Sequence, residues 1–530
     1  MKTTFKILAQ NERSSLAHRL KFASDIKIVI VVAMMAVMSL SCEKGLKPDV
    51  YSSLSSSTFF KSASDASAAV TAMYGGMLGG PNLYEAGWSG SNNGWKIQSS
   101  METDETVCSW GWPGWKRMNQ LQFSIDDDVI VGIYTNLMPV ISQITIDMAA
   151  IQPIVMDDNL KARYIAELRA MRAHYSQILF QLYGPVPIRL DAVIAADPNA
   201  KPIPRPSKDS MIYYIESDYK AAAAVLPASF TGNDYGHFTS TACLTGLMKL
   251  YMSQRRWQDA VTVGEQIKTT GYHLITNYAD NFSYANKGGN SEIILAIPCN
   301  ASASKSYNNW LADVLPPSPA YYDPSLPADQ SLSEWGGYKM PWSTYDKFDP
   351  TDKRLSVLLA KYTVDASGTL FDARNGGTVG GTYFAPLLGA IPKKYGADPT
   401  STTGVMGTDI VVYRYADVEL LLAEALNEVN SGPTNEAYDL VNDVRNRAGV
   451  APYAYGSLNY STFRSKIMDE RLFELWCEGQ RREDMIRWGT FVQYAASQGS
   501  PFATANDTLY PLPQKVITET GGVVKQNLGY

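Results

Sequence analysis

The sequence predicts a mainly α-helical protein in which a long irregular segment interrupts the helices and strands are few and short. Three observations support this fold class. Apolar residues recur every three or four positions in several stretches of the chain. Glycine and proline mark the points where these stretches end. Residues 271–410, in contrast, are rich in Gly, Pro, Ser, Asn and Tyr and show no sustained helical spacing.

The first 58 residues predict an exported, lipid-anchored protein. A basic lead precedes an apolar run over 28–38, which is too short to span a bilayer because a span needs about 20 apolar residues. Ser39-Leu40-Ser41 then precede Cys42, which resembles a bacterial lipoprotein signal that is cut just before an acylated cysteine. We therefore expect a lipoprotein signal peptide over 1–41, lipidation at Cys42 and a Ser-rich tether over 42–58.

Composition argues against several kinds of function. The formal net charge is -6, so the surface repels phosphate backbones and no nucleic-acid partner is expected. The four histidines are scattered without metal-ligand spacing, so neither a metal site nor a cofactor is predicted. The other cysteines form no CxxC pair, and we expect them to be small buried apolar residues: Cys108, Cys243, Cys299 and Cys477.

The first helices are expected over 62–74, after the acidic run at 126–128, and over 158–183. The Ala-rich stretch 62–74 has high helix propensity. Three aspartates at 126–128 suit a helix start, where they meet the positive end of the helix dipole; calcium binding there would need more oxygen ligands. The helix over 158–183 carries one apolar stripe and ends at Gly184-Pro185.

Two pairs of helices follow, far apart in the sequence. A helix over 208–226 ends at Pro227, and residues 240–270 then form a helix, a polar turn and a second helix. Residues 411–430 and 434–447 form another pair, with Gly432-Pro433 at the turn. Each pair resembles a tetratricopeptide unit, so the repeats are interrupted. Between them, only Glu292–Pro298 is expected to be a buried strand.

Three glutamates on one helix face raise the possibility of a glycoside hydrolase. Glu470, Glu474 and Glu478 are four residues apart, and paired carboxylates can act as acid and base on a glycosidic bond. Arginines lie close in the sequence, and a carboxylate paired with arginine stays ionised, which removes a general acid. We therefore predict a structural ion-pair network with Arg471, Arg481, Arg482 and Arg487, and no enzyme activity.

Aromatic residues cluster in two loop-rich segments and predict a sugar-binding face. Aromatic rings pack on the apolar faces of sugars, while polar side chains bond to the hydroxyl groups. Tryptophans among glycines do not suit a helix core, so we expect at least two of these rings to be exposed. Asn92, Asn93, Asn308 and Asn309 are polar candidates beside them. The predicted ligand-binding residues are Trp88, Trp95, Trp110, Trp112, Trp115, Tyr307, Trp310, Trp335, Tyr338 and Trp342. Trp257, Trp476 and Trp488 lie at helix-core spacing and are expected to be structural.

Several motifs, in this order, resemble the SusD/RagB family over nearly all of residues 42–530. The segments that carry the resemblance are 168–170, 183–187, 204–206, 413–425, 441–449, 470–488, 510–514 and 526–530. The resemblance implies four tetratricopeptide-like helix pairs under an irregular ligand-binding face. In this view 59–530 is one SusD-like domain, with a helical half over about 59–270, a loop-rich insertion over about 271–410 and a second helical half over about 411–530.

The resemblance also implies a function. Family members mostly bind oligosaccharides at the surface of Bacteroidetes-type cells, and some bind peptides. It implies a lipid anchor in the outer membrane and a TonB-dependent, SusC-like transporter as partner. We therefore expect glycan binding and delivery to such a transporter, with peptide capture for the same kind of transporter as the alternative. A peptide-binding protein would offer strand edges that pair with a backbone and fewer flat aromatic surfaces.

Overall fold

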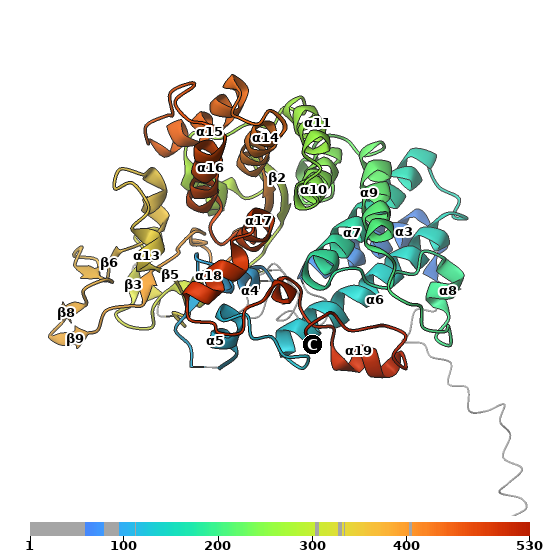
Figure 1. Cartoon of the computed structure of the whole chain (residues 1–530), viewed down its shortest axis with the longest axis horizontal. Helices are drawn as coiled ribbons and strands as arrows, with labels where there is room; N and C mark the ends of the chain where they lie inside the picture. The colour runs from blue at the N-terminus through green and yellow to red at the C-terminus, as the bar shows by residue number, and fades with distance from the viewer. Residues whose placement is uncertain are drawn as a thin grey trace, which may run out of the picture. The chain divides into compact units, whose positions relative to one another are not determined.

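The computed structural model describes residues 59–78, 95–111, 113–302, 307–326, 331–332, 334–401 and 405–530. The expected signal peptide, Cys42 and the tether lie outside the described residues. Residues 60–530 form one compact unit. Within it, long helices stand side by side as a frame, and the irregular segment with its short strands lies against one end of that frame (Figure 1).

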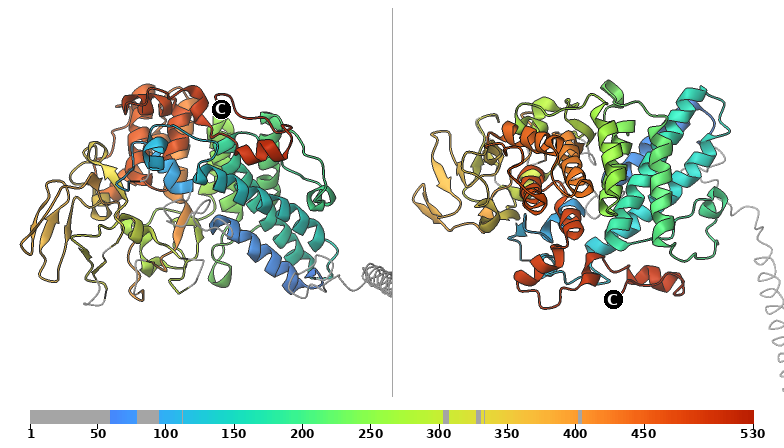
Figure 2. Two further views of the ribbon diagram at one scale, coloured as in Figure 1. Left: turned by 90° about the horizontal axis from the view of Figure 1, so that it is seen from below. Right: turned by 45° about the horizontal axis from the view of Figure 1, so that its top comes forward.

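The frame is a series of neighbouring helices, each packed on the next. α6 packs on α7, α7 on α9, α9 on α10, α10 on α11, α11 on α14, and α14 on both α15 and α16 (Figure 2). Their bounds are α6 Asp128–Ile151, α7 Asp158–Tyr183, α9 Lys208–Ala223, α10 Ser240–Ser253, α11 Trp257–Lys268, α14 Tyr415–Val429, α15 Asn435–Ala448 and α16 Tyr460–Leu475. A mainly helical fold is therefore confirmed.

The two helix pairs that are far apart in sequence are neighbours in space. α11 lies against α14, and Gly264 makes this close approach possible: a Cβ there would come within 2.9 Å of the Leu422 side chain. Similarly, a Cβ on Gly246 of α10 would come within 2.5 Å of the Tyr219 ring on α9. The helical series therefore continues across the gap, and residues 271–410 leave and rejoin it as an insertion.

One boundary differs from the sequence prediction. Residues 410–414 are not the first turn of a helix but strand β11, Ile410–Arg414. β11 pairs antiparallel with β2, Ile293–Ile297, and both strands are fully buried. Val411 and Tyr413 are β-branched and aromatic residues that favour a buried strand, and their partner lies over a hundred residues earlier, where helical spacing cannot reveal it. The expected strand at 292–298 is confirmed.

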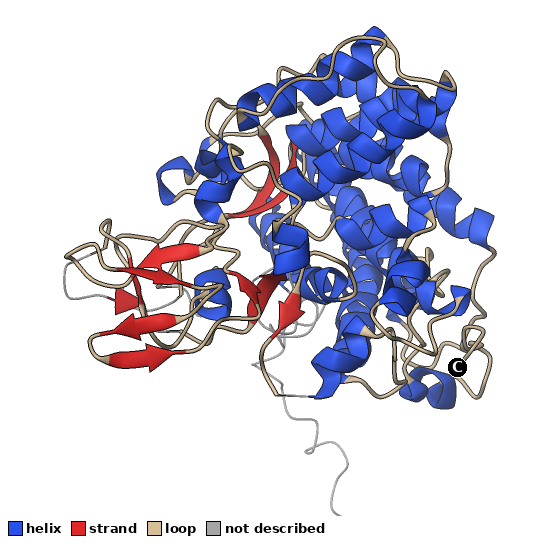
Figure 3. Ribbon diagram, turned by 60° about the vertical axis from the view of Figure 1, so that its left-hand side comes forward, coloured by secondary structure: helices blue, strands red, loops and turns tan. Residues whose placement is uncertain are grey.

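The remaining elements are short, and most strands gather outside the helical frame (Figure 3). Strands β1, β5 and β10 form one small sheet, while β3–β4, β6–β7 and β8–β9 are separate antiparallel pairs. The strands are β1 Val107–Cys108, β3 Tyr321–Tyr322, β4 Ser331–Leu332, β5 Tyr338–Pro341, β6 Lys361–Thr363, β7 Leu370–Asp372, β8 Gly377–Val379, β9 Thr382–Phe384 and β10 Gly389–Ala390.

Short helices complete the chain. They are α3 Ala63–Tyr74, α4 Trp95–Met101, α5 Pro113–Asn119, α8 Ala192–Ala196, α12 Trp310–Val314, α13 Trp342–Tyr345, α17 Arg481–Trp488, α18 Phe491–Ser497 and α19 Gln514–Glu519. The 3₁₀ segments are η2 Gly75–Leu78, η3 Gly232–Asp234, η4 Tyr278–Phe282, η5 Tyr284–Asn286, η6 Lys353–Val357 and η7 Ala505–Thr508.

The core explains several residues that the sequence marks as structural. Trp476 and Trp488 are buried, and Trp257 is half-buried against the core. Cys243, Cys299 and Cys477 are buried free thiols, as expected, while Cys108 is only partly buried. α6 is long and apolar enough to cross a membrane by composition, but Ile130, Ile133 and other apolar side chains along it are buried against neighbouring helices. This burial is typical of a core helix.

Candidate functional site

The two aromatic-rich segments, more than 200 residues apart, are joined by a strand pair. β1 pairs antiparallel with β5, with Val107 opposite Lys339 and Cys108 opposite Tyr338. The hydroxyl of Ser109 donates to the carbonyl oxygen of Gly336 at 2.8 Å and extends this link. The pairing places the 107–119 segment beside the 310–340 segment, so the predicted aromatic residues of both segments meet in one cluster.

The centre of this cluster is packed core. The Tyr338 ring lies 5.1 Å from the ring of Trp110, 5.8 Å from that of Trp115 and 6.4 Å from that of Trp310, measured between ring centroids. Trp115, Trp310 and Tyr338 are 4%, 3% and 0% exposed, so these three rings are not among the exposed rings that the sequence leads us to expect. The rings pack together with buried aliphatic side chains of the same segment, among them Leu311, Val314 and Leu315.

Trp335 is the exposed member of the cluster. Its exposed fraction is 53%, yet its backbone is fixed: its N–H donates to the carbonyl oxygen of Ala312 at 2.9 Å, and its carbonyl accepts from the Trp110 indole N–H at 3.0 Å. Trp110 is half-buried. Its ring packs over Gly337, where a Cβ would lie 2.3 Å from the indole. An exposed indole therefore stands at the rim of a rigid aromatic base.

The other predicted aromatic residues have different surroundings. Trp342 is half-buried; its indole N–H donates to the Leu387 carbonyl at 3.1 Å, and the Arg374 guanidinium lies 4.4 Å from its ring. Tyr307 is half-buried. Trp95 is the first residue of α4, which fixes only its backbone position. Trp88, Trp112, Asn92 and Asn93 lie outside the described residues.

The polar candidates Asn308 and Asn309 are buried, so they do not face solvent beside the rings. The Asn308 side chain accepts from the backbone N–H of Trp310 at 2.9 Å and donates to the Thr408 carbonyl at 3.1 Å. It organises the start of α12. The expectation that these two amides offer hydrogen bonds to a ligand is therefore wrong for this conformation.

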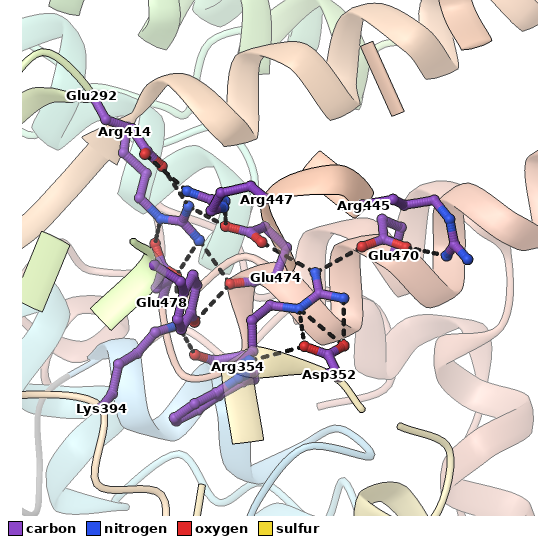
Figure 4. A network of polar contacts seen from close by, with 12 residues as sticks. Glu292, Asp352, Arg354, Lys394, Arg414, Arg445, Arg447, Glu470, Glu474 and Glu478 are labelled. Carbon is purple, nitrogen blue, oxygen red and sulfur yellow. Dashed lines mark hydrogen bonds and ion pairs between the residues drawn. The ribbon is translucent and has the colours of Figure 1, made fainter. Parts of the chain in front are cut away.

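The three glutamates form part of a buried ion-pair network, as the sequence predicts (Figure 4). Glu470 pairs with Arg354 at 2.7 Å, Glu478 pairs with Lys394 and Arg414, and Glu474 pairs with Arg354, Arg414 and Arg447. Burial alone would raise the pKa of Glu474, but these guanidinium groups outweigh it and hold the pKa well below its usual range. A carboxylate held ionised in this way cannot act as a general acid.

The arginine partners, however, are not the ones that sequence proximity suggests. The network draws on Arg354, Arg414, Arg445 and Arg447, which come from distant segments. The four arginines near the glutamates in sequence pair with other acids: Arg471 with Asp417 and Asp484, Arg481 with Asp104, Arg482 with Glu102 and Glu483, and Arg487 with Glu424 and Asp484.

Sequence reasoning missed two cavities. One, of about 300 Å³, lies between the loop before α10 and strand β2, and Phe230, Tyr235, His237 and Tyr272 are among its walls. The other, of about 410 Å³, is lined by Glu419, Asp443 and neighbouring polar residues. Their lining residues are dispersed along the chain, and no spacing pattern connects them.

Comparison with known proteins supports the resemblance found in the sequence. Residues 291–530 match the SusD family. The chain is 24% identical to SusD-like protein P25 of Formosa agariphila, over 93% of this chain and 95% of that protein. It is 23% identical to the starch-binding protein SusD of Bacteroides thetaiotaomicron, over 82% of this chain and 84% of that protein.

Solved structures agree on the fold. A laminarin-binding SusD-like protein has a TM-score of 0.73 at 21% identity, covering 89% of this chain and 100% of that one. Surface glycan-binding protein A from Bacteroides thetaiotaomicron, in complex with laminarihexaose, has a TM-score of 0.70 at 19% identity, covering 88% of this chain and 99% of that one. Residues 291–530 therefore carry the pattern of the SusD family, and the likeness in fold to SusD-like proteins extends over 89% of the chain.

Proposed function

We propose that this protein binds a glycan at the cell surface and delivers it to a TonB-dependent, SusC-like transporter in the outer membrane. The observation that carries the proposal is the half-exposed indole of Trp335, whose backbone is fixed by hydrogen bonds beside a packed aromatic cluster. The fixed backbone presents the indole to solvent, where the apolar face of a sugar can stack on it.

Relatives support the same class of ligand. Relatives and structural neighbours include a starch-binding protein and a laminarin-binding protein, and one neighbour was solved with laminarihexaose. Each of these ligands is a glucose polymer, whose sugar faces suit an indole platform. A glucan is therefore the first ligand class to test.

A binding role without catalysis fits the chemistry of the carboxylates. The glutamates that the sequence offers as acid and base are locked in ion pairs away from solvent. We propose that the chain is not an enzyme, and purified protein incubated with each polysaccharide should release no reducing sugar. Saturable release of reducing ends would contradict this part of the proposal.

The lipid anchor is inferred from the N-terminal signal, and the transporter partner from the family resemblance. Acylation at Cys42 would hold the protein in the membrane plane, which raises its effective concentration beside a transporter. Metabolic labelling with a fatty-acid probe tests the anchor, because Cys42→Ala should lose the label. Co-purification of a barrel protein with the wild-type chain from outer membranes tests the partner.

The decisive experiment is calorimetric titration with soluble laminarin and starch oligosaccharides. Trp335→Ala should weaken binding about tenfold, which corresponds to ~1.4 kcal/mol. Tyr213→Ala is the matched control, because Tyr213 is 66% exposed on α9, outside the aromatic cluster. Equal affinities for wild type and Trp335→Ala would remove Trp335 from the site, and no binding to any glycan would overturn the proposed ligand class.

One observation favours the alternative of peptide capture. Within the described residues β2 pairs only with β11, and Ile293–Ala296 of β2 line the 300 Å³ cavity. A strand edge beside a cavity is what an extended peptide uses when it adds to a sheet. Titration with a mixed peptide library beside the glucans separates the two, because peptide binding that is unaffected by Trp335→Ala would favour the cavity.

A further inference from the structure

The buried ion network in Figure 4 is balanced in charge. Ten residues take part in its ion pairs, and five are acidic and five basic: Glu292, Asp352, Glu470, Glu474 and Glu478, with Arg354, Lys394, Arg414, Arg445 and Arg447. Every positive charge of the network is therefore matched by a carboxylate within it. At the edge of the network, Arg447 keeps an Nε that has no partner in the described part of the chain, and its charge also acts on a further buried carboxylate.

Glu419 is that further carboxylate. It lies on α14 and is 5% exposed, and within the described residues its Oε2 has no hydrogen-bond partner. Burial raises the pKa of Glu419 well above its usual range, the nearby carboxylates of Asp443 and Glu292 raise it further, and the Arg447 guanidinium offsets only part of this rise. An unpaired buried carboxyl group is costly unless it gains a proton or a positive partner.

The group is not sealed in, because its side chain lines an open cleft of about 410 Å³. Asp443 lines the same cleft from α15, and its pKa is also raised, first by burial and then by Asp439. Asn446 contributes an amide on the same helix. Arg447 reaches the cleft, but its terminal nitrogens already pair with Glu292 and Glu474. Glu419, Asp443 and Asn446 thus line one open cleft, and the unpaired Oε2 of Glu419 is buried beside it.

We propose that Glu419 and Asp443 bind a calcium ion in this cleft. Oxygen donors of this kind suit a hard cation, and calcium tolerates an irregular set of ligands better than magnesium does. Within the described residues no three His, Cys, Asp or Glu side chains gather as a metal cage. Water and Asn446 must therefore complete the coordination, and the expected dissociation constant is about 0.1–1 mM, the range of extracellular calcium modules.

Substitution of Lys353 should strengthen calcium binding, whereas substitution of the carboxylates should weaken it. Lys353 lines the same cleft and is exposed, and its aliphatic stem packs close to Gly449. Its positive charge opposes a bound cation. Lys353→Met keeps most of the stem and removes the charge, so calcium should bind about threefold more tightly, and this gain should shrink at high salt.

Calorimetric titration of the whole mature protein with CaCl₂, at constant ionic strength, tests the site. Wild type should show saturable binding, Glu419→Gln should weaken it at least tenfold, and Asp443→Asn should weaken it less. Glu519→Gln, an exposed carboxylate on α19, is the matched control and should bind like wild type. A cooperative melting transition shows that Glu419→Gln is folded. A rise in melting temperature with calcium, present in wild type and absent in this variant, shows that the site has been lost.

Proton release provides an independent readout. If the Glu419 carboxyl group holds a proton in the free protein, calcium replaces that proton, and the measured heat depends on the ionisation enthalpy of the buffer. The other charged or titratable groups around the cleft are His273, Lys353, Asp443, Arg447 and, behind them, Glu292 and Glu474. Absence of saturable calcium binding up to 10 mM, or equal binding by Glu419→Gln, would overturn the proposal. Neither result bears on glycan binding by Trp335.

Discussion

Two buried regions of this protein handle polar groups in opposite ways. Where the insertion meets the second helical half, five carboxylates and five basic groups pair with one another. Under the aromatic cluster, Asp313 is 0% exposed and neither of its carboxylate oxygens has a partner within the described residues. Nearby, the Lys339 ammonium donates to three backbone carbonyls, those of Val314, Gly336 and Tyr338.

This difference in the pairing of buried polar groups distinguishes the helical frame from the aromatic region proposed to bind ligand. Ion pairs of the network connect β11, α15, α16 and Glu478 with Glu292, Arg354 and Lys394 of the insertion, so they tie the insertion to the helices. The aromatic region depends on stacked rings and leaves polar groups poorly matched. Regions that bind ligands are commonly the less stable ones. If so, substitutions in the ion network should mainly change stability, and exposed residues of the aromatic region should mainly change glycan binding.

Removing one cation from the centre of the network should have the largest effect. Arg414 contacts Glu292, Glu474 and Glu478, so Arg414→Met leaves three buried carboxylates with fewer partners. We expect a loss of about 3–5 kcal/mol in the free energy of unfolding, measured by urea denaturation. Arg445→Met is the control at the rim, since Arg445 is partly exposed and pairs only with Glu470; its loss should be about 1 kcal/mol. Equal losses would show that the network does not act as one unit.

Filling the space at Gly337 should disturb the aromatic region instead. A Cβ at this position would clash with the Trp110 indole, so Gly337→Ala should cost about 1–3 kcal/mol and displace the support of Trp335. Glycan affinity should fall together with stability. Gly432→Ala is the control, because nothing lies within 4 Å of the position of its Cβ. Unchanged glycan affinity in a destabilised Gly337→Ala protein would separate the packing of the cluster from its binding role.

The unpaired Asp313 predicts a pH dependence. Burial, with a further contribution from Glu334, raises the pKa of Asp313 well above its usual range. The folded chain therefore holds a proton that the unfolded chain releases above pH ~4, and this contribution to stability is lost as pH rises. Between pH 4 and 7, Asp313→Asn should gain stability relative to wild type by at most about 1.4 kcal/mol per pH unit. Denaturation curves at several pH values measure this, and parallel curves for the two proteins would contradict it.

The sequence predicts the helices better than it predicts the site, for a physical reason. Helical spacing is local, and the helix over 158–183 has the same bounds in the structure. The pairing of β1 with β5 joins residues more than 200 positions apart, and no local sequence pattern near Val107 or Lys339 predicts it. Residue type alone also cannot distinguish Trp310, buried in the cluster, from Trp335, exposed at its rim, because both are tryptophans in loop-rich sequence.

The smallest expected effect on stability belongs to the residue on which the proposed function most depends. Trp335 is 53% exposed, and its hydrogen bonds to Ala312 and Trp110 use backbone atoms that any residue supplies. Trp335→Ala should therefore change the free energy of unfolding by only about 0.5 kcal/mol while glycan affinity falls. A large loss of stability would mean that the indole is part of the core and not a platform. Measured beside Arg414→Met, which should unfold more easily yet keep its exposed indole, this variant shows directly whether the frame and the binding surface are separate.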